Sequence, residues 1–274
     1  MKTILIATDF SESSMNAGCY AVSLAKQLDA KIILLHIFHI PVVPSETPII
    51  IVSYDELEKD NMLRTKTFEE QLKAKANYKN EIKSIVRPGF LSDEIKDVVT
   101  EEGIDLIVMG IKGTSGLNEF LIGSNTTSVI KNVDCAILVI PENVVFKSIK
   151  NIAFACDLEN TKESKSLNQI KSLVNIFNSK LMIINVVDPA AKPSFQKAIS
   201  GVKLEDVFEK TNHTLHFPED NDMIFAINEF IDKHAIDLLI MVPKKHSLIG
   251  GLFHKSSTKK MAFHSHIPLL AIHE

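Results

Sequence analysis

The chain contains an internal repeat, and this repeat constrains the fold more than any other feature of the sequence. Residues 2–9, KTILIATD, recur as KNIAFACD at 150–157, and residues 31–38, KIILLHIF, recur as KLMIINVV at 180–187. Residues 103–110, GIDLIVMG, recur as AIDLLIMV at 235–242. Three similar segments in the same order indicate a duplicated unit. With 274 residues, the chain is long enough for two domains of ordinary size.

The offset between the copies locates the domains. It is 148 and 149 residues for the first two segments but 132 for the third, so the second copy has lost 17 residues in its middle. The first copy has a proline-rich segment at 41–48 and a long polar helix in that region. We predict domains at 1–146 and 147–274, with the boundary in the segment 142–148.

The pattern within each copy predicts the fold class. Apolar runs at 4–7, 32–37 and 106–109 are too short for helices and do not alternate, as expected for parallel strands covered on both faces. A helical pattern at 18–28 follows serines at 11–14 that can cap it, and another follows Ser92 and ends at Gly103. This alternation predicts an α/β fold of two tandem doubly wound parallel-sheet domains, with ligands bound after Ala7, Ile37 and Met109.

Composition excludes several classes of protein. Hydrophobic residues at 45% and charged residues at 23% exclude a disordered or collagen-like chain. A net charge of −4 and the absence of Trp argue against a nucleic-acid partner. The most apolar long segment, 32–54, contains two histidines, a glutamate and three prolines, so we expect no membrane span. Three cysteines without CxxC spacing, and no signal-peptide pattern, predict a cytoplasmic protein.

Four of the ten glycines, at 110, 113, 116 and 123, lie within fourteen residues that follow a predicted strand. Glycine permits positive φ and leaves backbone N–H groups accessible to a ligand, and the Gly-Ser-Asn-Thr run at 123–126 opens a predicted helix. These features predict a cradle for an anion such as phosphate. The alternative is that the glycines only make a flexible loop.

The spacing Gly110-x2-Gly113-x9-Gly123-Ser124 resembles the phosphate-binding signature of the ATP-binding universal stress proteins. The strand end Ala7-Thr8-Asp9, the strand end at Ile37 and the closing run CAILVIP at 135–141 agree with that family. The resemblance covers the whole chain as two tandem copies. It implies the adenine nucleotide alpha hydrolase-like fold and ATP as the ligand; in the alternative of an ATP hydrolase, Mg2+ would be brought by the triphosphate.

The resemblance also implies a role for each matching residue. Asp9 would accept hydrogen bonds from the ribose hydroxyls or from adenine, and the backbone of Ile37 would read the adenine edge. Without the resemblance, Asp9 reads as a helix cap and Lys112 as an exposed loop lysine. The complete nucleotide-binding set implied is Ala7, Thr8, Asp9, Ile37, Met109, Gly110, Lys112, Gly113, Gly123, Ser124, Asn125 and Thr126.

The second copy departs from the motif. Asp157 and Val186 match Asp9 and Ile37, but Val242, Lys245 and Lys255 replace the glycines at 110, 113 and 123. Side chains would occupy positions where bare backbone is needed. We therefore predict one ATP site, in the first domain. The lysines and histidines after Met241 leave open another anion for the second domain, and their spacing predicts no metal site.

No catalytic motif is recognisable. GxxxxGK[ST], GxGxxG, GxSxG, HExxH and the SGGxDS loop of ATP pyrophosphatases are all absent from the sequence, so no catalytic residue and no metal ligand are assigned. The resulting hypothesis is an ATP-binding regulatory protein of the stress response. Two alternatives stay open: a slow Mg2+-dependent ATP hydrolase, and a nucleotide-independent scaffold that binds another ligand in its second domain.

The resemblance implies an arrangement of the two domains as well. In single-domain members, the last strand, here 137–140, pairs antiparallel with its twin across a dimer axis. In a tandem chain, residues 269–272 of the second copy would take the place of the twin, giving an intramolecular pseudo-dimer. Whether the chain also forms a homodimer is left open by the sequence.

Overall fold

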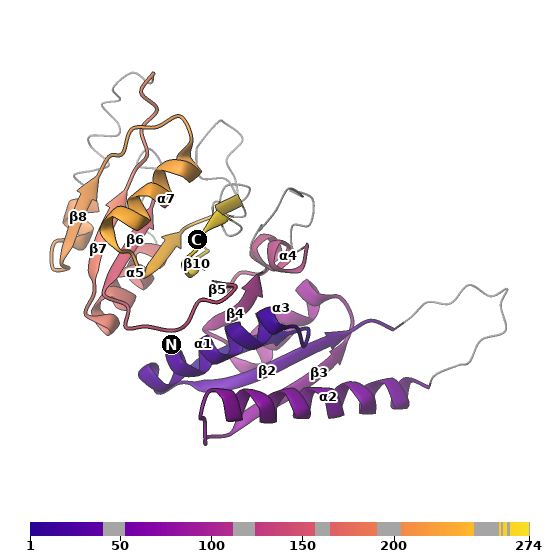
Figure 1. Ribbon diagram of the computed structural model, residues 1–274. Coiled ribbons are helices and arrows are strands. Elements are labelled where there is room, and N and C mark those ends of the chain that lie inside the picture. The colour runs from indigo at the N-terminus through magenta and orange to yellow at the C-terminus, as the bar shows by residue number, and fades with distance from the viewer. Residues whose placement is uncertain are drawn as a thin grey trace. The chain divides into compact units, whose positions relative to one another are not determined.

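The computed structural model describes residues 1–40, 53–111, 124–156, 165–190, 204–243, 258, 260, 261 and 264–273. Contacts divide these residues into two compact units, one that ends at Phe146 and one that begins at Lys147 (Figure 1). Each unit contains a parallel sheet with helices packed against it, and the two are described separately below.

The sheet of the first unit consists of β1 (Thr3–Thr8), β2 (Lys31–Phe38), β3 (Ile82–Pro88), β4 (Leu106–Ile111) and β5 (Ala136–Pro141). Its strands are ordered β3-β2-β1-β4-β5, and all neighbours are parallel. The helices are α1 (Glu12–Leu28), α2 (Tyr54–Lys75), α3 (Leu91–Glu102) and α4 (Ser124–Asn132). Because the winding reverses between β1 and β4, this is the doubly wound sheet that the sequence predicts.

The sequence explains where these elements begin. The predicted cap of α1 is confirmed, since the side chain of Ser11 accepts a hydrogen bond from the backbone N–H of Ser14. The helix expected after Ser92 begins earlier, at Leu91, and its N-cap residue Phe90 supplies no side-chain hydrogen bond. The hydroxyl of Ser92 lies 2.7 Å from that of Ser128 and so links α3 to α4.

The second unit repeats this topology. Its strands are β6 (Asn151–Ala155), β7 (Lys180–Ile184), β8 (His213–His216), β9 (Leu238–Met241) and β10 (Leu269–Ala271), ordered β10-β9-β6-β7-β8 and parallel throughout. Helices α5 (Lys165–Phe177) and α7 (Met223–His234) accompany them. The order is that of the first unit read from β5 to β3, which confirms the duplicated fold.

One carboxylate in each unit explains why the IDL segment recurs. Asp105, just before β4, accepts hydrogen bonds from the backbone N–H groups of Lys2 and Thr3 at 2.6 and 3.1 Å. Asp237, just before β9, accepts the equivalent bonds from Lys150 and Asn151 at 2.8 and 2.9 Å. Each carboxylate satisfies two donors at the start of the neighbouring strand, so it fixes the strand pair that flanks the reversal of winding.

The residues that end α3 and α7 allow two opposite substitutions that test backbone strain. Gly103 ends α3 with φ +62°, and Ala235 ends α7 with φ +48°, both left-handed. An alanine side chain in this conformation costs about 1 kcal/mol, and a Cβ added to Gly103 would meet no atom within 4 Å. We expect Gly103→Ala to destabilise its unit, and Ala235→Gly to stabilise its own, each by about 1 kcal/mol in urea unfolding. Changes of the same sign in both variants would contradict this account.

Candidate functional site

A cavity of about 340 Å3 opens at the carboxyl ends of β1, β2 and β4 in the first unit. This is the place where the winding of the sheet reverses, and where doubly wound folds bind their ligands. The end of β1 and the start of α1 form one wall, β4 and the start of α4 another, and residues after β2 and at the start of α3 complete it. The volume is within the range of small-molecule sites.

Eight of the twelve residues predicted to bind nucleotide line this cavity. They are Ala7, Thr8, Asp9, Ile37, Met109, Gly110, Asn125 and Thr126. Lys112, Gly113 and Gly123 lie outside the described residues; Ser124 begins α4, but its side chain is not described. The structure thus brings together residues from four separate segments of the chain, and their role in nucleotide binding stays a prediction.

Six lining residues were not in the predicted set: Ser11, Ser13, Ser14, His39, Leu91 and Ile111. The serines were interpreted only as a helix cap, although they follow the end of β1 directly. His39 comes two residues after Ile37, so an extended chain places both on the same side. The two-residue spacing from Ile37 could have indicated that His39 lines the cavity. Nothing in the local sequence indicated that Leu91 does.

Asp9 is held as an ionised hydrogen-bond acceptor. Its Oδ1 accepts from the backbone N–H of Ser11 at 3.0 Å and from the Ser11 hydroxyl at 2.5 Å. Partial burial by itself would raise the pKa of the Asp9 carboxyl, but the hydrogen bonds from Ser11 and Ser14 outweigh it and the pKa lies below its ordinary value. Because the N-cap of α1 is Ser11, the simple cap interpretation of Asp9 does not hold. An ionised carboxylate at a cavity wall accepts hydroxyl donors well.

The hydroxyl of Thr8 is used within the protein. It accepts from the backbone N–H of Phe10 at 3.0 Å and lies 3.0 Å from the Ser14 hydroxyl. The Ser14 hydroxyl also lies 2.9 Å from the backbone carbonyl of Ser11, so the Thr8 hydroxyl belongs to a hydrogen-bond network within the turn. Thr8 therefore shapes the turn at the cavity wall, and we assign it no polar contact with a ligand.

The turn that carries Asp9 is fixed from behind. Phe10 has φ +65°, which is unusual for a residue with a side chain. Its ring centroid lies 4.1 Å from that of His36, and the guanidinium of Arg64 lies 4.6 Å from the Phe10 ring. His36 is buried and its ring nitrogens lie 2.9 Å from the Thr8 carbonyl and 3.0 Å from Asn61 Oδ1. These contacts hold the strained turn in place from β2 and α2.

Gly110 is required by packing. A Cβ built on it would lie 2.2 Å from the carbonyl oxygen of Ser13 and 3.0 Å from the backbone nitrogen of Ser14. The first turn of α1 therefore crosses β4 at a distance that only glycine permits. The sequence interpretation attributed this glycine to a ligand approaching bare backbone. The structure shows a further demand on this glycine, the close approach of α1, which places the serines of α1 beside the cavity.

The start of α4 supplies hydrogen-bond donors. Asn125 and Thr126 are in its first turn and line the cavity. The backbone N–H groups of a first turn have no acceptor within the helix, and the positive end of the helix dipole lies there. The Thr126 hydroxyl is 3.5 Å from the carbonyl of Gly110, a long contact that leaves its donor free to choose a better acceptor. This wall of the cavity suits an anion.

The second unit carries other residues at the positions of the glycines. Val242, which stands at the place of Gly110, follows β9 directly. Lys245 and Lys255, the other positions on which the prediction of a degenerate site depends, lie outside the described residues, as does Asp157, the counterpart of Asp9. The number of nucleotide sites per chain stays a prediction.

Metal-binding clusters and membrane-spanning helices are both absent from the described residues. Within those ranges, no three histidine, cysteine, aspartate or glutamate side chains gather as a metal ion would require. Over the same part of the chain, none of the helices has the length and apolar character to span a membrane.

Comparisons with known proteins agree with the fold. The sequence pattern of the universal stress protein family matches residues 1–141, about half of the chain. A universal stress protein of Methanocaldococcus jannaschii is 32% identical over 144 residues, 51% of this chain and 81% of the relative. One from Synechocystis is 25% identical over 298 residues, 98% of this chain and 99% of the relative.

The solved structures extend the likeness to the second unit. The crystal structure of a universal stress protein from Archaeoglobus fulgidus covers 99% of this chain and 98% of its own, with a TM-score of 0.75 and 17% identity. At that identity the likeness concerns the fold, which it shares over both units. Together with the family pattern in residues 1–141, the doubly wound sheet and the cavity at its switch point make the chain a member of the universal stress protein family.

Proposed function

We propose that the first unit binds ATP in the cavity at the carboxyl ends of β1, β2 and β4, and that nucleotide occupancy regulates a response to stress. The observation that supports this most strongly is the convergence of eight predicted residues on one cavity. They come from four segments between residues 7 and 126, so a chance arrangement would scatter them. The function is that of a binding protein, since the site offers no assigned catalytic residue.

The chemistry of the walls suits the parts of an adenine nucleotide. Ala7, Ile37 and Met109 form an apolar region for the base. The ionised carboxylate of Asp9 accepts from the ribose hydroxyls. The first turn of α4, with Asn125 and Thr126, would hold the phosphates, together with the predicted glycines at 113 and 123 and with Lys112.

Bound Mg2+ would neutralise charge on the triphosphate, and it would be held mainly by phosphate oxygens and water. The donors in the cavity wall are hydroxyl and amide groups, which can donate hydrogen bonds to phosphate oxygens. Such donors are compatible with a metal ion that is carried by the nucleotide. We assign no protein ligand to the ion.

The proposal includes one site per chain and a cytoplasmic location. The second unit has Val242 at the place of Gly110 and lysines at the places of Gly113 and Gly123, which favours a single site.

Cys19, Cys135 and Cys156 form no disulfide among the described residues. Unbridged thiols are typical of proteins in reducing compartments.

Comparison of ATP with adenosine tests the assignment of the phosphates. Adenosine has the same base and sugar but nothing for the start of α4 to hold. We expect calorimetric titration of nucleotide-free protein to give a dissociation constant for adenosine at least about tenfold above that for ATP, the loss of one or two charge-assisted hydrogen bonds. Equal affinity for ATP and adenosine would contradict the assignment of the phosphates to the start of α4. Tighter binding of GTP than of ATP would contradict the assignment of the adenine base.

A further inference from the structure

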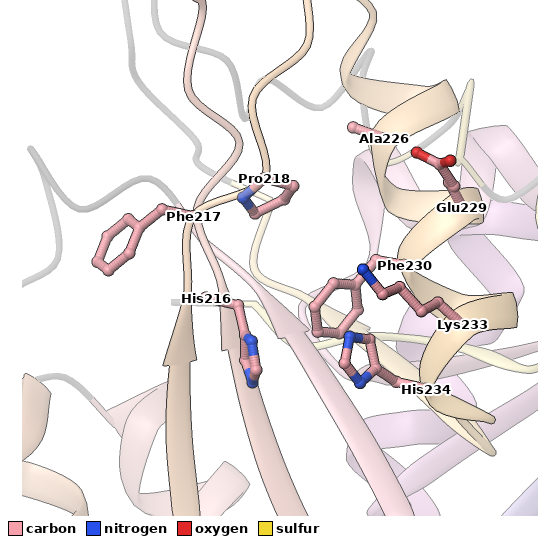
Figure 2. A pocket seen from close by; sticks show the side chains of 8 residues that line it. All are labelled: His216, Phe217, Pro218, Ala226, Glu229, Phe230, Lys233 and His234. Atoms are coloured by element: carbon pink, nitrogen blue, oxygen red, sulfur yellow. The ribbon is translucent and has the colours of Figure 1, made fainter.

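The second unit has a cavity of its own, of about 310 Å3, between the end of β8 and one face of α7. His216 and Pro218 contribute from the strand side, and Glu229, Phe230, Lys233 and His234 from the helix (Figure 2). None of these residues corresponds to a position of the nucleotide site, because the counterparts of Asp9, Ile37 and Met109 are Asp157, Val186 and Met241. The cavity is therefore independent of the proposed function.

In the first unit, the corresponding surface carries ion pairs. Lys83 on β3 pairs with Glu102 on α3 at 2.7 Å, and Arg87 pairs with Glu101 at 2.5 Å. Gly103 and Ala235, the left-handed residues that end α3 and α7, are 132 residues apart. At the same offset, Lys233 is the counterpart of Glu101, and His234 is the counterpart of Glu102. The helix side of the surface thus changes from two carboxylates to an ammonium and an imidazole.

The strand side changes as well. Ile33 pairs with Lys83 in the first sheet, and its counterpart Met182, at an offset of 149, pairs with Thr214 in the second. By this register Thr214 replaces Lys83 and Pro218 replaces Arg87. Both basic side chains that neutralise the helix in the first unit are missing, and in the second unit the cavity opens at this place.

Lys233, in the last turn of α7, has no carboxylate partner among the described residues. Its side chain makes no hydrogen bond or ion pair with any residue in the described part of the chain, and Glu229, one turn earlier, is not its partner. Figure 2 shows Lys233 and His234 extending from α7 towards β8, whereas the carboxylate of Glu229 lies beside Ala226 at the other end of the cavity. Positive and negative groups are thus separated along its length.

Two imidazoles and an aromatic ring lie beside Lys233. The ring centroids of His216 and His234 are 5.3 Å apart, and Phe230 lies 4.1 Å from His234 and 4.9 Å from His216. Burial lowers the pKa of His216, and the neighbouring His234 and Lys180 lower it further. The remaining nearby acid on α7 is Asp232, which pairs with His266 at 2.8 Å. Lys233, and His216 in its protonated form, therefore favour a bound negative charge at this end of the cavity.

We propose that this cavity binds a small organic carboxylate with an apolar body. Its carboxylate lies among Lys233, His216 and His234, and its body lies against Phe230 and Pro218. The volume of about 310 Å3 suits a compact molecule. Glu229 opposes a second negative charge at the far end of the cavity, so the site disfavours nucleoside triphosphates and other polyanions.

Benzoate is the probe that tests the proposal, with benzyl alcohol as its uncharged counterpart, smaller by one oxygen atom. In protein labelled with 13C at histidine, benzoate should shift the imidazole signals of His216 and His234 saturably, with a dissociation constant on the order of 1 mM for nine non-hydrogen atoms. Because the bound anion stabilises protonated imidazole, binding should be tighter at pH 6 than at pH 8, and the pKa of His216 should rise in the complex.

Lys233→Gln should weaken benzoate binding about tenfold. Lys210→Gln is the matched control, an exposed lysine of the same unit that does not line the cavity, and it should leave binding unchanged. Both side chains are exposed, so thermal unfolding should be the same in both variants. Equal shifts with benzyl alcohol, equal affinity for inorganic phosphate or ATP, or unchanged binding in Lys233→Gln would each overturn the proposal.

Discussion

Gly110→Ala should destabilise the first unit by about 3 kcal/mol, which corresponds to a fall in melting temperature of about 6 to 12 °C for a domain of this size. The new Cβ would lie 2.2 Å from the Ser13 carbonyl oxygen and 2.5 Å from its carbon. Both atoms belong to the backbone, so no side chain can rotate away. The first turn of α1 or the end of β4 must move, and with it the cavity wall formed by Ser13 and Ser14.

Gly103→Ala is the control for this variant, because an alanine there meets no neighbour and carries only the backbone penalty. Urea unfolding of the two variants side by side separates close packing from loss of glycine itself. We expect Gly110→Ala to be the more destabilised by about 2 kcal/mol. Equal stability of the two variants would show that α1 does not need glycine at this crossing.

Asp9→Asn should weaken ATP binding roughly 10- to 100-fold, the effect of losing a hydrogen bond to a charged acceptor. The substitution keeps an oxygen that can accept from Ser11, so the turn at 9–11 is retained. The hydrogen bonds that lower the pKa of Asp9 keep the carboxylate ionised down to low pH. For the wild type we therefore expect no loss of ATP affinity attributable to Asp9 between about pH 8 and 5.

Asp29→Asn provides the matched control. Asp29 is an exposed carboxylate at the opposite end of α1, where its left-handed conformation, φ +50°, is one that asparagine also adopts readily. Calorimetric titration of the folded variants should give wild-type ATP affinity for Asp29→Asn and reduced affinity for Asp9→Asn. Wild-type affinity in both variants would place the ribose away from Asp9.

The buried strands could be predicted because burial leaves a local signal. The run around Ile4 to Ala7 is apolar on both faces of its strand, and the repeat confirmed the pattern in the second unit. The edge strands β3 and β8 left no such signal. Lys83, Ser84 and Arg87 interrupt β3, and β8 is a four-residue segment flanked by histidines. These strands exist because a neighbour pairs with them, which a single sequence does not record.

Some of the cavity residues could likewise be predicted from the local sequence, whereas others depend on the packing of distant segments. Asp9, Ile37 and Met109 were predictable because ligand sites of doubly wound sheets lie at strand ends. Leu91 was not, because it reaches the cavity only through the packing of α3. The packing role of Gly110 was missed for a similar reason, since the backbone that it accommodates lies about a hundred residues earlier in the chain. The β8–α7 cavity depended on a strand that the sequence did not reveal.

The stoichiometry of ATP binding tests the central claim most directly. Protein freed of bound nucleotide would be titrated with ATP and Mg2+ in a calorimeter, with the concentration of folded protein measured independently. We predict one ATP per chain, abolished or strongly weakened by Asp9→Asn. Two ATP per chain would contradict the prediction of a single site, and no binding by folded protein would contradict the proposed function itself.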